Sequence, residues 1–426
     1  MMGEKTKQLI ADVKLPRMFP VRQTFRRPQI EPERIPIYMK ELLLNAPCTD
    51  KIKLGMSIAV TAGSRGIANI DVITKCVVDF IKEKKAVPFI VPAMGSHGGA
   101  TAEGQKEVLH GYGISEESMG CEIRSSMEVA RIGMNDEGTD VYIDKHAAQA
   151  DGIIVVGRVK PHTSFRGPFE SGLMKMMTIG LGKQYGAEVC HNAGFRHMAK
   201  NIPLFGRAIL QNSPVLFAAA ILENAFDETA RIEIVDADDI ETRESELLRE
   251  AFSYMAKIGV PKCDVLIVDA IGKNFSGNGM DNNVTGTHCT PYVSGGLDAQ
   301  KVVVLDISEE SHGNFMGLGH AAVTTRRAVQ KLDLDATYAN AVTCKLVEGS
   351  SIPVFMDTDR EAIQLALKIC VNYNEENPKV VRILNSMQLE TIWLSEAFLD
   401  EITDIPDLEQ SGEAEEMAFD KNGRLI

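Results

Sequence analysis

The sequence has no apolar run that approaches the roughly 20 residues needed to cross a membrane. Its first residues, 1–5, contain no apolar signal-peptide core. The eight cysteines are scattered, and no two of them form a Cys-x-x-Cys pair. This pattern argues against zinc ribbons and disulfide frameworks, so we expect reduced thiols in a cytoplasmic protein with no membrane partner.

The sequence also lacks an excess of basic residues, because 45 Lys and Arg stand against 59 Asp and Glu, giving a net charge of -14. A nucleic-acid partner would need a basic surface, so we expect none. Local arginines and backbone amides can still hold a small anion. No internal repeat stands out, and 426 residues exceed one comfortable core, which predicts two domains.

A glycine turn with an arginine follows the first predicted strand. The apolar segment 58–60 runs into Gly63, Ser64 and Arg65, and a helix is predicted over 71–81. Free amides at a helix start and a guanidinium both favour phosphate or carboxylate. This turn is therefore a candidate anion site.

Two further strands each end in a loop that carries a histidine. The segment 87–94 precedes the Gly-Ser-His sequence ending at His97, with a helix predicted over 102–109. The β-branched run 152–157 precedes Lys160-Pro161-His162. Ligands bind at the carboxyl ends of strands in open α/β sheets, so we expect both histidines at one site.

A glycine-rich stretch follows His162 and contains Lys175 and then His191. We interpret the glycines as positions where the chain approaches a ligand closely without side chains in the way. They are Gly167, Gly172, Gly180, Gly182 and Gly186.

This order of strands, glycine turns, histidines and lysine resembles the nickel-dependent lactate racemase family of 2-hydroxyacid racemases and epimerases. The resemblance covers most of the first two hundred residues. In that family a lysine is joined through a thioamide to a nickel pincer nucleotide, and a histidine sixteen residues later binds the nickel. Lys175 and His191 have this spacing. A planar site of one imidazole and soft sulfur donors suits nickel.

The resemblance also implies roles for the earlier motifs. His97 and His162 match the two acid/base histidines, and Arg65, with Ser64 and Gly63 beside it, matches the part that binds the nucleotide phosphate. The implied reaction moves a hydride from C2 of a 2-hydroxy acid to the cofactor and back to the opposite face. Enzymes that build the cofactor are the implied partners.

The chain departs from the lactate-specific members in three places. It has Ala62 and Ser64 where they carry an aspartate and a threonine, and its loop after His162 is longer and introduces Arg166 and Glu170. The second half replaces their glutamine and lysine pattern with the polar segment 277–286, from which we select Asn283 as a substrate contact. These departures favour a sugar acid such as gluconate over lactate.

Two other functions are open. A non-enzymatic relative could bind a nucleotide or small acid on the same fold without nickel. A zinc hydrolase using His97, His162 and His191 lacks a carboxylate at ligand spacing. Lys183 competes with Lys175 as the anchor, but it lies only eight residues before His191. The histidines for which we expect ordinary structural roles are His197, His288, His312 and His320.

We expect two α/β domains with mainly parallel sheets and an active site in the interdomain cleft. The predicted division is a cofactor-binding catalytic domain at 1–259, an α/β domain at 260–399 and an acidic tail at 400–426. The tail is expected to be solvated or to return to the first domain. Predicted elements of the second half are strands at 263–269, 302–306 and 380–384 and helices at 245–258 and 359–371.

Overall fold

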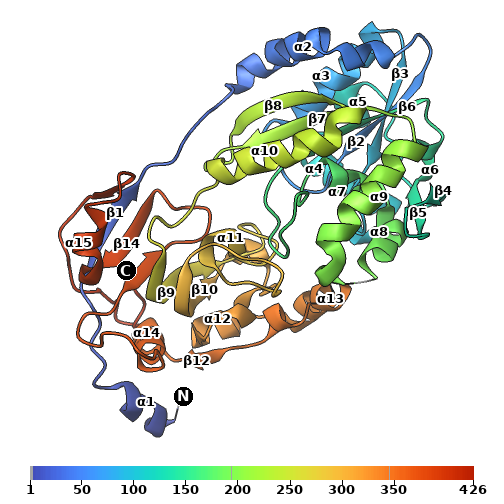
Figure 1. The fold of residues 1–426 in the computed structure, drawn as a ribbon. Helices are drawn as coiled ribbons and strands as arrows, with labels where there is room; N and C mark the ends of the chain where they lie inside the picture. The colour runs from blue at the N-terminus through green and yellow to red at the C-terminus, as the bar shows by residue number, and fades with distance from the viewer. Residues whose placement is uncertain (1–2, 193, 345) are drawn as a thin grey trace. The chain divides into compact units, whose positions relative to one another are not determined.

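The computed structural model describes residues 3–192, 194–344 and 346–426. The chain forms two compact units, which we call the central unit, Arg26–Met255, and the terminal unit, which combines the residues up to Phe25 with Ala256–Ile426 (Figure 1). The division therefore differs from the expected one at both ends. The segment up to Phe25, expected in the first domain, belongs to the terminal unit because its strand pairs with two strands of that unit.

The central unit is built on a five-stranded sheet of order β3-β2-β6-β7-β8. The first four strands are parallel and β8 is antiparallel to β7. The three strands predicted from the apolar segments 58–60, 87–94 and 152–157 are all present. The strands are β2 (Ser57–Ala62), β3 (Val87–Pro92), β6 (Gly152–Arg158), β7 (Val215–Glu223) and β8 (Thr229–Asp236).

Alternating residues of the central-unit strands point to opposite faces, and both faces are covered by helices. Ile153 and Val155 of β6 join one apolar core, whereas Ile154 and Val156 join the other. The first face packs against α7 (Leu173–Lys175), α8 (Lys183–His191), α9 (Met198–Asn212) and α10 (Ile240–Tyr254). The second packs against α2 (Ile35–Asn45), α3 (Ile70–Glu83), α4 (Ala102–Gly111) and α5 (Glu116–Met119). A hairpin of β4 (Val129–Met134) and β5 (Asp140–Asp144), followed by α6 (Lys145–Ala148), lies beyond the sheet.

The strand order creates a topological switch point between β2 and β6. The chain leaves β2 for its neighbour β3 on one side, and leaves β6 for β7 on the other side. The loops after β2 and β6 therefore separate at the carboxyl edge of the sheet. Such a point is where open α/β sheets bind ligands.

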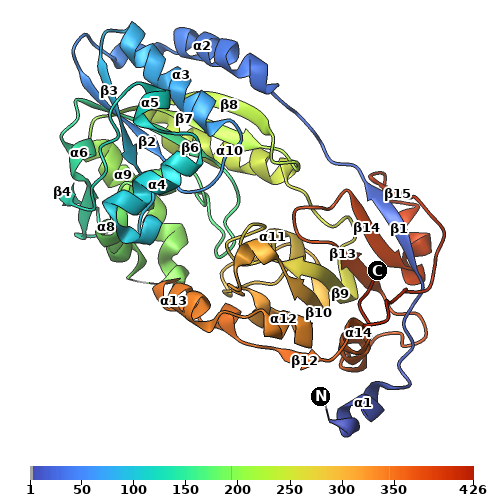
Figure 2. The same cartoon turned by 180° about the vertical axis from the view of Figure 1, so that it is seen from behind.

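The terminal unit contains an eight-stranded mixed sheet of order β12-β11-β10-β9-β13-β14-β1-β15 (Figure 2). Its first five strands are parallel and the last three antiparallel. The α/β fold with mainly parallel sheets is thus confirmed. The strands are β1 (Met18–Gln23), β9 (Lys262–Ile271), β10 (Asp298–Ile307), β11 (Val323–Thr325), β12 (Val354–Met356), β13 (Val380–Ile383), β14 (Thr391–Ser395) and β15 (Leu408–Gln410). The helices are α1 (Glu4–Ile10), α11 (Asn282–Thr285), α12 (Arg326–Gln330), α13 (Leu334–Cys344), α14 (Asp359–Lys368) and α15 (Leu399–Ile402).

The acidic tail is ordered, and its backbone completes the sheet of the terminal unit. β15 pairs with β1, and the backbone of Glu415 exchanges hydrogen bonds with that of Met18. Near the end of the chain, the Leu425 N–H donates to the buried carboxylate of Asp359 (2.9 Å). The tail is therefore not loose, but most of its acidic side chains are exposed to solvent, and it returns to a strand that we had expected in the first domain.

One helical expectation also needs correction. The helix expected over 245–258 is α10, which begins at Ile240 and ends at Tyr254. The segment of His312 and His320, which lies outside the elements predicted above, forms two short 3-10 turns. Among the described residues, no helix is long and apolar enough to cross a membrane.

Candidate active site

The predicted site residues follow three neighbouring strands of the central unit. The Gly63–Arg65 turn follows β2, the loop of His97 follows β3, and the loop of His162 follows β6. All three loops start at the same edge, and two of them flank the switch point. The sheet therefore brings these motifs together as the sequence predicted.

His97 is held at its ring and at its backbone. The Ser64 hydroxyl forms a short hydrogen bond with His97 Nδ1. Ser64 is itself fixed, because the Tyr112 hydroxyl donates to its carbonyl oxygen (2.9 Å). The Gln105 amide donates to the carbonyl oxygen of His97 (3.3 Å). The exposed imidazole is thus tied to the turn that follows β2.

His162 is held as a neutral ring with one defined tautomer. The Ser164 N–H donates to His162 Nδ1 (3.0 Å), so the neutral ring carries its proton on Nε2. Burial lowers the pKa of His162 well below its usual value, and the positive charges of Lys175 and Lys160 add to the effect. His162 therefore presents an Nε2–H group at neutral pH.

Arg166 and Glu170, which the sequence suggested for substrate recognition, bond the His162 loop itself. Glu170 accepts from the His162 N–H (2.7 Å) and from the Gly167 N–H (3.2 Å). Arg166 Nη1 donates to the carbonyl oxygen of His162 (2.6 Å) and pairs with Glu170 (3.2 Å). Burial raises the pKa of the Glu170 carboxyl despite these bonds. The two charged residues therefore stabilise the loop conformation.

Lys175 ends the short helix α7 and leads into a π-helical turn over Met176–Gly180. Such turns are frequent at functional sites. Burial lowers the pKa of Lys175 to about 8, and the charges of Arg65 and Lys160 contribute. A substantial fraction of the amine is therefore neutral, and nucleophilic, at pH 7 to 8.

His191 is the last residue of α8, and its ring has a fixed orientation. Its Nδ1 lies 2.7 Å from the carbonyl oxygen of Ala187, which can only accept a hydrogen bond. Nδ1 therefore carries the proton, and the lone pair of the neutral ring is on Nε2. A backbone carbonyl that orients a histidine in this way is typical of metal ligands.

The electrostatic effects show that these groups are close together. Lys175, Lys160 and His191 each lower the pKa of His162, and Arg65 lowers that of Lys175. The site is therefore a group of cations and imidazoles at the carboxyl edge of the sheet. It suits an anionic ligand, and its amine, single oriented imidazole and arginine fit the donor set expected for a lysine-linked nickel pincer nucleotide.

We had expected the glycines to leave open space for a ligand, but the glycines allow close packing within the protein instead. A Cβ on Gly180 would lie 2.6 Å from the Ala93 carbonyl oxygen. One on Gly186 would lie 3.0 Å from the Tyr142 carbonyl oxygen. Even at Gly63, in the predicted cofactor turn, it would lie 2.9 Å from Met176 Cε. The glycines thus allow the loops of the site to pack closely against neighbouring carbonyl oxygens and side chains.

Glu244 is a residue that the sequence reasoning missed. This buried carboxyl on α10 accepts from the Met174 N–H (2.7 Å), one residue before Lys175. Burial raises its pKa to about 8, and its Oε1 has no hydrogen-bond partner among the described residues. A Cβ on Gly172 would lie 2.0 Å from that oxygen. Glu244 therefore fixes the turn of Lys175. The signal was a glutamate on the apolar stripe of Ile240, Leu247 and Ala251.

The remaining predicted residue belongs to the terminal unit. Asn283 belongs to α11 of the terminal unit, where its N–H donates to Asp281 Oδ1 (2.8 Å). In the described part of the chain no three His, Cys, Asp or Glu side chains gather to hold a metal.

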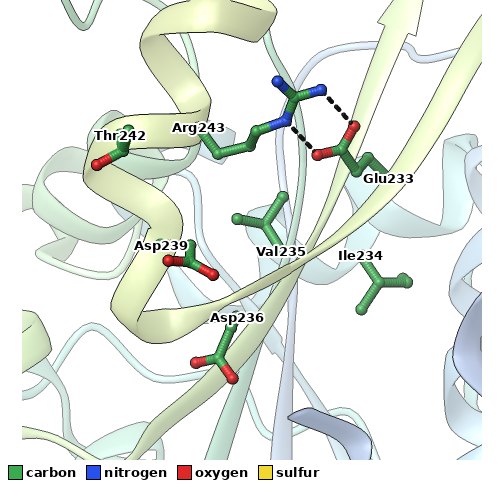
Figure 3. Close-up of a pocket in the computed structure, with 7 residues that line it drawn as sticks. All are labelled: Glu233, Ile234, Val235, Asp236, Asp239, Thr242 and Arg243. Atoms are coloured by element: carbon green, nitrogen blue, oxygen red, sulfur yellow. Dashed lines mark hydrogen bonds and ion pairs between the residues drawn. The ribbon is translucent and has the colours of Figure 1, made fainter. Parts of the chain in front are cut away.

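A separate hollow of about 220 Å³ lies between β8 and α10 (Figure 3). Arg243 and Glu233 pair across it. Its acidic lining does not include any of the predicted residues. It is not the site described above.

Comparisons with known proteins agree with this description. Residues 26–202 match the family model described as the lactate racemase N-terminal domain. The lactate racemase apoprotein from Thermoanaerobacterium thermosaccharolyticum has a similar structure, with a TM-score of 0.50 and 14% sequence identity over 86% of this chain and 94% of that chain. At that identity the likeness shows the fold alone. A search of the curated proteins gave no match.

Proposed function

We propose that the chain, whose residues 26–202 match the lactate racemase N-terminal domain, is an isomerase that inverts C2 of a 2-hydroxy acid with a nickel pincer nucleotide. The observation that carries the proposal is the grouping of a low-pKa lysine, two oriented histidines and an arginine at the switch point. The matched region includes all of them.

The cofactor would be held by residues of the central unit. The neutral amine of Lys175 would form the covalent link, and His191 would offer its Nε2 lone pair to the nickel. Arg65, with the Ser64 and Gly63 turn, would hold the phosphate. When bound, the cofactor would supply the hydride acceptor and donor that a redox-neutral inversion at C2 needs.

The proton chemistry falls to His97 and His162, and their settings differ. The Ser64 hydroxyl beside His97 can donate or accept, so the His97 ring can hold its proton on either nitrogen. His162 is neutral with its proton on Nε2, and from there it can donate a hydrogen bond to the oxygen on C2. General acid/base catalysis contributes roughly 10²- to 10⁴-fold, so loss of either ring should raise the barrier by about 3 to 5 kcal/mol.

We propose a polar 2-hydroxy acid, with a sugar acid such as gluconate favoured over lactate. The cation of Lys160, whose charge acts on His162, suits a carboxylate. The longer loop after His162 and the Asn-rich segment with Asn283 support a substrate with more hydroxyl groups than lactate. We also propose Arg166 as a substrate contact, because it is a cationic residue of the longer loop after His162.

The test is to load the protein with cofactor and measure inversion of each acid by chiral chromatography in deuterated water. We expect the C2 epimer of gluconate to accumulate and to carry at C2 the hydrogen that the substrate had there. Deuterium at C2 would contradict hydride transfer, and faster turnover of lactate than of any polyhydroxy acid would contradict the substrate preference.

The alternative is a protein that binds a small acid or nucleotide on this fold without catalysis. Loaded, nickel-containing protein that binds gluconate but inverts no acid would favour it. We also propose that the protein acts in the cytoplasm, where thiols stay reduced; the seven cysteines whose side chains are described are free thiols. The proposed partners are the enzymes that build the cofactor.

A further inference from the structure

Lys183 is a fully buried lysine that the proposed chemistry does not use. It starts α8, the helix that ends at His191, and has a left-handed backbone with φ 54°. Its ammonium group donates to the Pro92 carbonyl oxygen (2.6 Å) and to Gln105 Oε1 (2.8 Å), and lies 3.3 Å from Asp144 Oδ2. Two hydrogen bonds and one ion pair thus compensate the buried ammonium.

Gln105 continues this contact toward the His97 loop. Its side chain is fully buried, and while its Oε1 accepts from Lys183, its Nε2 donates to the Gly95 (2.9 Å) and His97 (3.3 Å) carbonyl oxygens. A backbone hydrogen bond also joins the two segments, because the Gly95 N–H donates to the Gly180 carbonyl oxygen (3.2 Å). Gly180 lies three residues before Lys183.

From these contacts we infer that Lys183 and Gln105 form a positioning pair that sets the His97 loop against the helix of His191. Lys183 connects the start of that helix to the end of β3, and Gln105 connects Lys183 to the loop. The inference rests on the proposed function for its catalytic consequence. Its structural core, that the pair controls His97, is independent of any cofactor.

The position of the bonds explains why the pair is suited to this task. The Ser64 hydroxyl holds only the ring of His97, so the ring can rotate with its loop unless the backbone is also fixed. Gln105 supplies that second point of attachment. A displacement of about 1 Å in a catalytic group can cost about 10²-fold in rate.

Two variants remove the contacts of Gln105 to different extents, and a third is a control. Gln105→Leu removes both the acceptor for Lys183 and the donor to the loop carbonyls. Gln105→Glu keeps the oxygen that accepts from Lys183 but replaces the donor to the loop carbonyls with a second oxygen. Gln184→Leu is the control, because it makes the same substitution one residue after Lys183 at an exposed position of the same helix.

The first measurement is the imidazole NMR signal of His97 in the cofactor-free chain, assigned with a His97→Gln variant. We expect the signal to shift or broaden in Gln105→Leu and in Gln105→Glu, and to stay unchanged in Gln184→Leu. Gln105→Glu should unfold at a higher temperature than Gln105→Leu because it retains the Lys183 bond. An unchanged His97 signal in a folded Gln105→Glu variant would overturn the inference.

The second measurement uses cofactor-loaded protein and separates kcat from KM. Gln105→Glu should lose about 10²-fold in kcat with little change in KM and with normal loading of Lys175. Wild-type-like kcat would overturn the catalytic consequence. If even the wild-type chain takes up no cofactor, the proposed function fails, while the His97 signals still decide whether the pair positions the loop.

Discussion

Replacing Glu244 with glutamine should stabilise the protein at alkaline pH and not at acidic pH. The fully buried carboxyl has its pKa raised from 4.5 to about 8 by burial. In the folded state it therefore keeps its proton up to about pH 8, whereas in the unfolded chain it loses it near pH 4.5. Between these values the folded state binds more protons, so the stability of the wild-type chain falls as pH rises.

The magnitude follows from the shift. One pKa unit corresponds to about 1.4 kcal/mol, so the full rise costs the wild-type chain about 5 kcal/mol above pH 8. Between pH 5 and pH 9 the free energy of unfolding of Glu244→Gln should rise by about 4 kcal/mol relative to that of the wild-type chain. At pH 5 the variant should be slightly less stable, by roughly 1 kcal/mol, because the amide adds a buried N–H without an acceptor.

Denaturant unfolding followed by circular dichroism at several pH values measures this difference. Glu246→Gln is a matched control, since it makes the same change on the same helix at an exposed position that pairs with Arg243. Its effect should stay within about 1 kcal/mol at every pH. A difference between Glu244→Gln and wild type that is flat or falls with pH would refute the view that Glu244 holds a proton beside the Lys175 turn.

Three further predictions concern the same region. Gly172→Ala would place a methyl carbon 2.0 Å from Glu244 Oε1, so it should destabilise the chain by about 1 to 3 kcal/mol in thermal unfolding; an unchanged midpoint would contradict the packing. In the cofactor-free chain, acylation of Lys175 should rise with pH to half its maximum near pH 8, as read by peptide mass spectrometry, whereas an ordinary lysine would continue to rise toward about pH 10. Nitrogen NMR should show His162 protonated on Nε2 and titrating below its usual range, and stability should fall as pH drops through that range because the unfolded histidine binds the proton first; an Nδ1–H tautomer would contradict the Ser164 contact.

The local parts of the fold could be predicted from the sequence. Three short apolar segments gave β2, β3 and β6, because a buried parallel strand needs a short, continuously apolar segment. Their order along the chain placed Arg65, His97 and His162 at one edge of the sheet. The spacing of Lys175 and His191 was recognised only through the family resemblance, because a turn at 181–182 and the left-handed Lys183 separate α8 from the helical turns of Lys175.

The long-range partners could not be predicted in this way. The glycines after His162 suggested space for a ligand, but their close neighbours, such as the Ala93 carbonyl oxygen, lie far away in the sequence. Glu244 was missed because its helix was expected to begin one residue later, at Ser245. The pairing of β1 with β14 and β15 joins opposite ends of the chain, which no local pattern encodes.

The intact mass and nickel content of the chain after co-expression with cofactor-building enzymes show whether Lys175 carries the cofactor. A Lys175→Ala variant serves as the control, and Lys183→Met tests the competing lysine. We expect one added cofactor mass with bound nickel in the wild-type chain and none in Lys175→Ala. Unmodified, nickel-free wild-type protein, or an adduct that persists in Lys175→Ala, would contradict this expectation.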